Sequence, residues 1–594
     1  MDKYNQADDH IDGLLESYVS FTDPKSFFLN AGAGAGKTYS LVNLMVNINK
    51  KYGTYLRKTN KKVAVITYTK VASEEIISRI PGITSFDTST IHSYLWNLIK
   101  GYDQNIKEAL IHFCDAKIYD YNSREKLTKK QQQELDSLEY KKSEIKKIQK
   151  FCYDPNSIIE SKNTLSHSEV LQVFSFLIYS NELFREIVYS KYPIILIDEC
   201  QDTNKEVLDA FIKLSKEKKI CIGLFGDAMQ RVYMDGKSNL IKDLDEFEVA
   251  EKKVNWRSYG RIVEFTNILR ESVDNLKQEV CSDDRKEKGL LRICLIDHNN
   301  SSRKMIEEDI SSNIQEKVIS HNVDTKYNPY KLVLEHKFAA ERNNFLNLFT
   351  AFKSSEDTKN IMSNDELSEE YRFFKKLVIP LYKSWQANDD FNLHRLLKKH
   401  SCRFDELNQY NSGAYKILNE IGQDFRELLD TFNDEITIGN LCESIIKSKL
   451  FEVPAKLKED FEEETGWKSS FEIDFKELIE FYDYHDGYLE IITQQGSKGL
   501  EYDHVQVVID DYNARGRSFS YEKLFGVKEK SATDINNESQ GKDTTLHKTN
   551  RVFYVACSRA IKSLVLIIYT SDQQKVKKYF LDNRLVNEEE IMIM

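Results

Sequence analysis

The chain has 594 residues, a formal net charge of −11 at pH 7, 41% hydrophobic residues and 30% charged residues. This composition excludes a mainly disordered chain, and the length predicts roughly three to five domains. The acidic balance argues against a protein uniformly coated in basic residues, although a local basic groove in an acidic protein can still hold a nucleic acid strand.

The cysteines and the N-terminal segment bear on metal content and location. Nine cysteines are scattered and no two form a Cys-x-x-Cys pair, which argues against a zinc ribbon or an iron–sulfur cluster. Residues 1–12 are polar and acidic, and no apolar run approaches the ~20 residues that span a membrane. We therefore expect a cytoplasmic protein with free thiols and no membrane partner.

The first predicted elements are a strand at 27–29, a glycine-rich loop and a helix through 49. Small residues in such a loop let backbone N–H groups approach phosphates, and the following helix offers its positive N-terminal end. Lys37 is expected to reach the β- and γ-phosphates of ATP, and the Thr38 hydroxyl to hold Mg²⁺. The nucleotide-binding residues expected here are Gly32, Ala33, Gly34, Ala35, Gly36, Lys37, Thr38 and Tyr39.

Further strands alternate with helices. Buried strands are predicted at 63–67, 194–197 and 220–225, and this alternation is typical of a parallel sheet with helices on its faces. The strand at 194–197 ends in Asp198 and Glu199, where ligands bind in such sheets. We expect Asp198 to hold Mg²⁺, and Glu199 to orient or deprotonate the attacking water.

Two helical stretches interrupt the alternation. Residues 100–190 are helical and charged, and the lysine- and glutamate-rich run at 117–150 is either a solvated helical face or a DNA contact. Strands return at 290–296 and 332–335, residues 345–480 are mostly helical, and strands follow at 489–493, 505–509 and 564–568. Residues 513–548 are polar and predict a flexible surface loop.

Seven short motifs carry a resemblance to a known family. Residues 198–203 (DECQDT) resemble the D-E-x-Q-D motif of UvrD, Rep and PcrA helicases. The other motifs follow in that family's order, at 65–72 (VITYTKVA), 89–93 (STIHS), 226–233 (GDAMQRVY), 254–258 (VNWRS), 493–502 (TQQGSKGLEY) and 554–560 (YVACSRA). The ordered set is far more specific than any single motif.

The resemblance implies an α/β fold with two RecA-like P-loop domains, parallel sheets and a mostly helical insertion in each. It places the first domain (1A) at 1–99 and 191–250, and its insertion (1B) at 100–190. The second domain (2A) would comprise 251–344 and 481–594, and its insertion (2B) 345–480. The implied enzyme is an ATP hydrolase, a superfamily-1A DNA helicase with ATP and Mg²⁺ as cofactors.

The same resemblance assigns roles in an ATP site between the two domains. The expected catalytic residues are Lys37, Glu199 and Gln230 from the first domain and Arg257 and Arg559 from the second. Two arginines delivered across a cleft neutralise the transferring phosphoryl group only when the cleft closes. On the nucleoside, Trp256 would stack on adenine, Glu501 would contact the ribose, and Gln6 is either the residue that contacts the adenine edge or an exposed polar residue.

For DNA, the family positions suggest stacking on bases by Tyr68 and Tyr233, with ordinary half-buried packing as the competing interpretation. Phosphate contacts are expected from Thr69, His92 and Thr493. The chain departs from the family pattern at 234–237 (MDGK), where a tryptophan and an arginine usually follow, and at Gln495, where the family has a histidine.

Two functions remain open on the sequence alone. One is a translocase or helicase on single-stranded DNA, or on DNA with a single-stranded tail, whose 3′→5′ direction is implied only by the resemblance. The other is a DNA- or nucleotide-sensing UvrD-like ATPase subunit that works with a nuclease partner, as in Gabija-type antiphage defence. The two differ in whether the chain unwinds duplex alone, and the pathway, DNA repair or defence, is not indicated.

Overall fold

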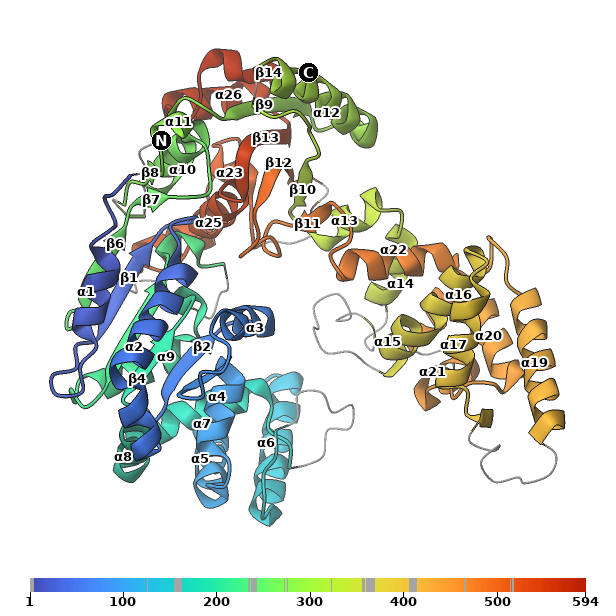
Figure 1. Cartoon of the computed structure of the whole chain (residues 1–594), viewed down its shortest axis with the longest axis horizontal. Coiled ribbons are helices and arrows are strands. Elements are labelled where there is room, and N and C mark those ends of the chain that lie inside the picture. Colours follow the sequence, from blue (N-terminus) through green and yellow to red (C-terminus); the bar gives the residue numbers. More distant parts are fainter. Residues whose placement is uncertain are drawn as a thin grey trace. The chain divides into compact units, whose positions relative to one another are not determined.

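The computed structural model describes residues 5–594 except 125, 154–162, 233–235, 237–242, 272, 275, 322, 355–357, 359–368, 405–413, 464–465, 513 and 515–517. It divides into two compact units, one formed by residues 1–330 and 494–594 and the other by residues 331–493 (Figure 1). Both parallel sheets predicted for the α/β fold are present, so the predicted fold class, two RecA-like domains with helical insertions, is confirmed.

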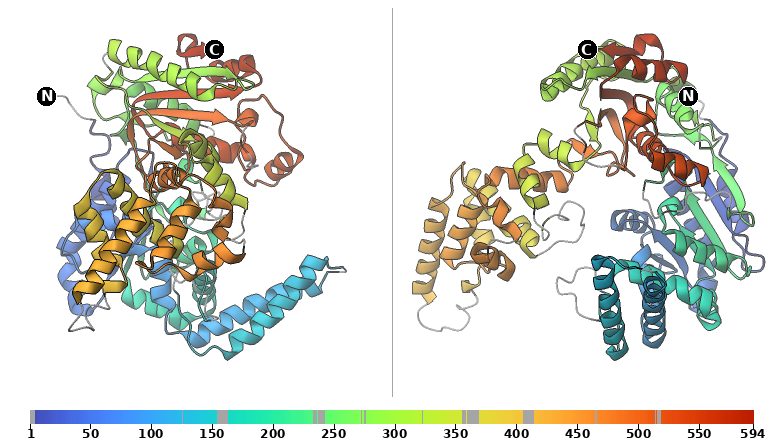
Figure 2. Two further views of the ribbon diagram at one scale, coloured as in Figure 1. Left: turned by 90° about the vertical axis from the view of Figure 1, so that its right-hand side faces the viewer. Right: turned by 180° about the vertical axis from the view of Figure 1, so that it is seen from behind.

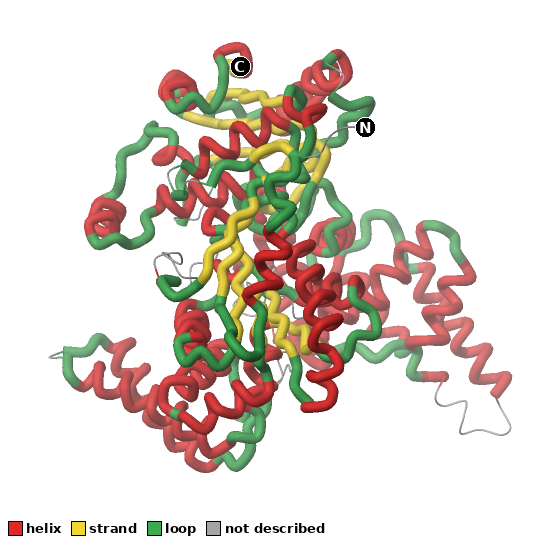
Figure 3. The backbone as a smooth tube through the Cα atoms, turned by 60° about the vertical axis from the view of Figure 1, so that its left-hand side comes forward, coloured by secondary structure: helices red, strands yellow, loops and turns green. Residues whose placement is uncertain are grey.

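The first unit contains a six-stranded parallel sheet in the order β3-β2-β4-β5-β1-β6. Its strands are β1 (Phe27–Ala31), β2 (Val63–Thr67), β3 (Phe86–Thr90), β4 (Ile194–Ile197), β5 (Cys221–Gly226) and β6 (Glu248–Lys252). Figure 3 shows these strands as a twisted sheet with helices on its faces. The parallel register brings the carboxyl ends of β1, β2 and β4 to one edge, where the predicted phosphate loop and carboxylates follow.

Both faces of this sheet are buried because alternate residues of its strands enter two separate cores. One core lies under α1 (Ile11–Tyr18), α2 (Lys37–Thr59) and α3 (Lys70–Arg79), and receives residues such as Leu29, Val65 and Leu196. The other receives their strand neighbours, such as Phe28, Ile66 and Ile197. It packs against α4 (Ile91–Ile99), α5 (Asp103–Asn122), α7 (His167–Ser180), α8 (Glu182–Lys191) and α9 (Lys205–Ser215).

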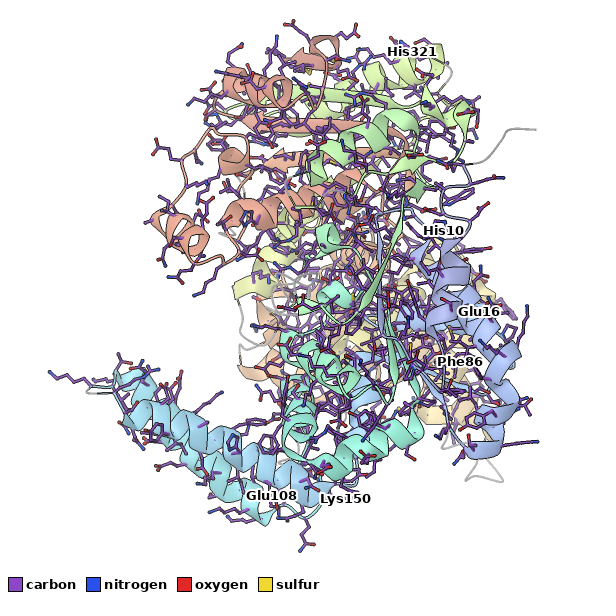
Figure 4. The ribbon with its side chains drawn as sticks, turned by 90° about the vertical axis from the view of Figure 1, so that its left-hand side faces the viewer. His10, Glu16, Phe86, Glu108, Lys150 and His321 are labelled. Carbon is purple, nitrogen blue, oxygen red and sulfur yellow. The ribbon has the colours of Figure 1, made fainter. Side chains whose placement is uncertain are left out.

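The helices between β3 and β4 include a long hairpin of α5 and α6 (Lys129–Lys147), which lie side by side in Figure 2. Figure 4 places Glu108 and Lys150 at one end of this hairpin, with most side chains pointing to solvent. Lys141 and Lys142 form ion pairs with Glu169 and Asp115, respectively. These pairs favour the solvated-face interpretation of the 117–150 run.

A second parallel sheet in the first unit contains β12-β13-β9-β14 in this order. Its strands are β9 (Leu290–Asp297), β12 (Tyr502–Asp510), β13 (Ala560–Thr570) and β14 (Ile591–Ile593), and it packs against α10 (Gly260–Arg270), α25 (Thr545–Cys557) and α26 (Gln573–Asp582). The short strands β7 (Val254–Asn255) and β8 (Glu279–Val280) pair with each other.

The segment 513–548 differs from its prediction. In place of a flexible loop, its described residues form α23 (Tyr521–Leu524), α24 (Ala532–Ser539) and the start of α25. The reason is a set of N-terminal caps that composition does not reveal, because Ser520, Ser531 and Thr544 each accept a backbone N–H at a helix start. Ser531 and Thr544 form complete capping boxes.

The second unit is almost entirely helical. It contains a parallel pair, β10 (Tyr330–Val333, whose first residue lies at the unit boundary) and β11 (Ile491–Thr493). Its longer helices are α13 (His336–Arg342), α14 (Leu346–Ser354), α16 (Ile379–Gln386), α17 (Asp390–His400), α19 (Ala414–Asp430), α20 (Ile438–Ser448), α21 (Ala455–Glu463) and α22 (Phe475–His485). An aromatic-rich core including Phe374, Tyr382, Trp467 and Phe481 holds them together.

Candidate ATP site

The predicted phosphate loop connects β1 directly to α2. Gly34 and Gly36 have φ of 75° and 80°, a left-handed conformation that only glycine adopts without strain. A Cβ on Gly34 would also lie 2.7 Å from the Cβ of Arg257. Lys37 begins α2, is buried, and donates from its Nζ to the Ala31 carbonyl at 3.1 Å. Its ammonium is therefore folded back across the loop.

Two carboxylates follow the buried strand β4. Asp198 is 7% exposed, and burial together with the neighbouring Glu199 raises its pKa. Glu199 has φ of 50° and donates its backbone N–H to the Asp198 carboxylate at 3.0 Å. A non-glycine residue in this conformation stores strain, which typically marks a functional position.

Lys498, in the loop before β12, forms ion pairs with Glu199 and Asp202, and the Glu199 pair spans 3.3 Å. Burial alone would raise the pKa of Glu199, but Lys498 and Lys37 outweigh burial and lower it. Glu199 is therefore ionised, the state that a base acting on water needs. The sequence motif contains Lys498, but sequence reasoning gave it no role.

Gln230 lies in the short helix after β5 and is 3% exposed. Its Nε2 donates to the Asp227 carboxylate at 2.8 Å, and its Oε1 accepts from Arg559 Nη2 at 3.5 Å. Asp227 is fully buried, so its hydrogen bonds hold Gln230 in one orientation.

The two predicted arginines, Arg257 and Arg559, lie together on the side of the site that is formed by the expected second RecA-like domain, called the second half below. Arg257 donates to Glu501 at 2.7 Å and to the Ser558 carbonyl at 3.0 Å. Arg559 is 1% exposed and donates to the carbonyls of Val555 and Leu500. Burial and the neighbouring Arg257 lower the pKa of Arg559, so a bound anion would stabilise its charged form.

The residues predicted to bind the nucleoside lie less close together than the predicted catalytic residues do. Trp256 is 47% exposed, as a stacking surface requires, and its backbone N–H donates to the Gly34 carbonyl at 2.9 Å. Glu501 is paired with Arg257. Tyr39 is 60% exposed at the start of α2, and Gln6 is exposed, its carbonyl accepting from the Asp9 N–H.

The implied Mg²⁺ fits the donors that the loop and β4 present. The Thr38 hydroxyl and the Asp198 carboxylate are hard oxygen ligands, and Mg²⁺ usually completes its shell with water and phosphate oxygens. Within the described ranges, no cluster of three or more His, Cys, Asp or Glu side chains could hold a metal ion. The chemistry of the two donors therefore suits a cation that arrives with its nucleotide.

The predicted DNA residues lie at the ends of strands in the first sheet, except for Thr493 and Tyr233. Tyr68 is 37% exposed after β2, and Thr69 caps α3 by accepting the Ala72 N–H at 3.2 Å. His92 starts α4, with its ring 4.5 Å from that of His167. Thr493 ends β11 in the second unit and is 6% exposed, whereas Tyr233 lies outside the described residues.

Comparisons with known proteins agree with this geometry. Residues 16–235 match the family model described as "AAA domain". The chain is 26% identical to the Gabija protein GajB of Bacillus cereus (strain HuB5-5), over 95% of this chain and 96% of that protein. It is 23% identical to a probable DNA helicase II homolog of Rickettsia conorii, over 91% and 89%. It is 24% identical to the ATP-dependent DNA helicase Rep of Escherichia coli, over 40% of each chain.

The resemblance to UvrD/Rep-like helicases, with a Gabija-type relative among them, is therefore confirmed. These relatives support a helicase-like ATPase that binds a nucleotide together with a divalent metal. Across the part of the chain that the structure describes, no helix is both long and apolar enough to cross a membrane.

Proposed function

We propose that the chain is an ATP-driven motor that moves on single-stranded DNA, with ATP bound between the halves that carry Lys37 and Arg559. One observation carries the proposal: Lys498 and Arg559 from the second half reach Glu199 and Gln230 of the first. Cations that cross a cleft to its catalytic groups make hydrolysis depend on closure. The catalytic roles of Lys37, Glu199, Gln230, Arg257 and Arg559 form part of this proposal, as do Mg²⁺ binding by Thr38 and Asp198.

We also keep the domain division as a proposal, with 1A at 1–99 and 191–250, 1B at 100–190, 2A at 251–344 and 481–594, and 2B at 345–480. Tyr68, Thr69 and His92 support a DNA path along the carboxyl edge of the first sheet, because side chains at the ends of β2 and β3 lie at the same edge. Stacking on bases is tolerant of sequence, which suits a motor that passes over any DNA.

Strand displacement tests the motor and its direction. Duplexes with a 3′ or a 5′ single-stranded tail are mixed with the full chain and ATP, and release of the shorter strand is followed. A 3′→5′ motor releases strands only from the 3′-tailed duplex. Release from the 5′-tailed duplex alone would contradict the proposed direction.

A second candidate is an ATPase subunit of an antiphage defence complex that contains a nuclease. The observation that favours it is the extent of the GajB match, which covers nearly the whole of both chains. The Gln495 and 234–237 departures lie on the DNA-coupling side, so they fit a chain that unwinds little alone. Strand release that appears only when a nuclease partner is added would favour this candidate.

A further inference from the structure

A buried charge network joins the phosphate loop to the residue that holds Gln230. At its centre is Arg270, the last residue of α10, which is 1% exposed. Its guanidinium donates to the Tyr554 hydroxyl at 3.1 Å, to Asp227 at 3.2 Å, and to Asp274 at 2.7 and 2.8 Å. An arginine so completely enclosed persists only where its partners satisfy it.

The network reaches the phosphate loop through the backbone of one residue, Ala33. The Tyr554 hydroxyl accepts from the Ala33 N–H at 3.4 Å and donates to Asp227 at 3.4 Å. The Ala33 carbonyl accepts from Asn255 Nδ2 and from Gln278 Nε2, both at 3.1 Å. Both backbone polar groups of Ala33 are thus held by side chains of the second half.

The packing leaves little room for the loop to shift. A Cβ on Gly32 would lie 2.6 Å from Arg270 Nη1 and 2.6 Å from the Gln278 side-chain amide carbon. Burial raises the pKa of Tyr554, so its hydroxyl stays neutral and can donate and accept at once. Asp227 in turn accepts from Gln230, whose other end meets Arg559.

We infer that Arg270 is a positioning residue which, through Tyr554 and Asp227, fixes the Ala33 backbone and the Gln230 side chain relative to each other. This inference rests on the proposed ATPase function and deepens it. The arm through Tyr554 fixes the predicted phosphate loop, and the arm through Asp227 fixes Gln230, one of the proposed catalytic residues. A change at Arg270 therefore disturbs both.

A double-mutant comparison tests the Gln230 arm. Arg270→Gln is expected to lower the kcat of ATP hydrolysis about tenfold in the wild-type background. In a Gln230→Ala background it should lower this kcat less than about twofold, because Arg270 acts through Gln230. Arg270→Lys should recover part of the loss. The matched control is Arg261→Gln, on the same helix, whose ion pair with Glu590 at 2.8 Å leads away from the site. Equal losses in both backgrounds would overturn the inference.

Hydrogen–deuterium exchange of the full chain without nucleotide tests the Ala33 arm, and it does not need hydrolysis. Tyr554→Phe, which removes one oxygen, and Arg270→Gln should each speed exchange in the peptide covering residues 30–40 at least threefold, whereas Arg261→Gln should not. Unchanged exchange in both variants overturns the inference. Faster exchange in a protein whose wild type does not hydrolyse ATP would refute the proposed function and leave the positioning role intact.

Discussion

At the scale of single residues, the central feature is a lysine that crosses to the carboxylates of the other half. Lys498 pairs with Glu199, whose side chain is 25% exposed, and with Asp202, which is buried. Removing one partner of a buried pair leaves an uncompensated charge, which costs far more than an exposed pair contributes. Lys498 therefore acts with Lys37 to keep Glu199 ionised, and it joins the two halves at the candidate ATP site.

Lys498→Met tests that role. We expect ATP hydrolysis to fall about 10²-fold, because a preorganised charge at a phosphoryl-transfer site typically contributes that much. Steady-state phosphate release at saturating ATP measures the effect. Lys562→Met is the matched control, since Lys562 is a partly buried lysine of the second sheet that pairs with Asp324 at 2.7 Å. Equal activities in the two variants would exclude a special role for Lys498.

The sequence predicts the strands and the helix around the proposed phosphate loop, and β4, because the chemistry expected there requires fixed residue types at fixed spacing. It does not predict the contacts of Arg270. Arg270 and Tyr554 are 284 positions apart and become neighbours only when α10 and α25 pack. Arginines in helices are mostly exposed, so no pattern in a single sequence distinguishes a buried arginine such as Arg270 from an exposed one.

At the scale of elements, the segment after β12 is ordered by one buried carboxylate. Asp534 is 1% exposed and accepts from Lys523 at 2.8 Å, from the Ser531 hydroxyl at 2.6 Å and from the Thr545 N–H at 2.8 Å. It thereby joins α23, the start of α24 and the start of α25. The polar residues that made this segment look like a loop include the residues that cap its helices.

Asp534→Ala should lower the free energy of unfolding by about 2–3 kcal/mol, since it leaves three partly buried donors without their acceptor. Denaturant unfolding measures the change. Glu538→Ala, on the same helix α24, breaks only an exposed ion pair with Lys530 and should cost less than about 1 kcal/mol. If both variants unfold at the same denaturant concentration, Asp534 does not organise this segment.

In the helical unit, His336 on α13 predicts a pH dependence of stability. Its Nδ1 lies 2.8 Å from the Tyr484 hydroxyl, and burial, with lesser effects of Lys353 and His485, lowers its pKa to about 4. In the unfolded chain, the His336 imidazole titrates near pH 6.5. Between these values the unfolded chain binds a proton that the folded chain does not, so stability falls as the pH drops from about 6.5 towards 4.

His336→Gln should therefore lose less thermal stability between pH 7.5 and pH 5.5 than the wild type, by roughly 2–4 °C. Melting curves of the full chain at the two pH values measure this difference. His321→Gln changes an exposed histidine directly after α12 (Arg303–Ser320) and should behave as the wild type does. A His336→Gln variant with the same pH dependence as the wild type would contradict the assignment.

At the scale of the whole molecule, the alternation of strands and helices predicts both parallel sheets and the two helical stretches that interrupt them. It cannot predict which halves meet, because domain packing depends on side chains that come together only in three dimensions. It also misses β3, β6, β7, β8 and β14, because these strands are either rich in polar residues or only two to three residues long. The ordered motifs nevertheless predict that the two halves pair, because Arg257 and Arg559 have a phosphate to neutralise only if they face Lys37.

The most direct test of the account is ATP hydrolysis with and without single-stranded DNA, in the wild type, Lys37→Ala and Arg559→Ala. Lys25→Ala, which alters an exposed lysine paired with Glu248, serves as the control. The account predicts that DNA stimulates wild-type and control hydrolysis at least tenfold, and that both site variants lose it, because each half supplies an essential cation. Wild-type hydrolysis that ignores DNA, or that persists in Arg559→Ala, would contradict a DNA-coupled site shared by the two halves.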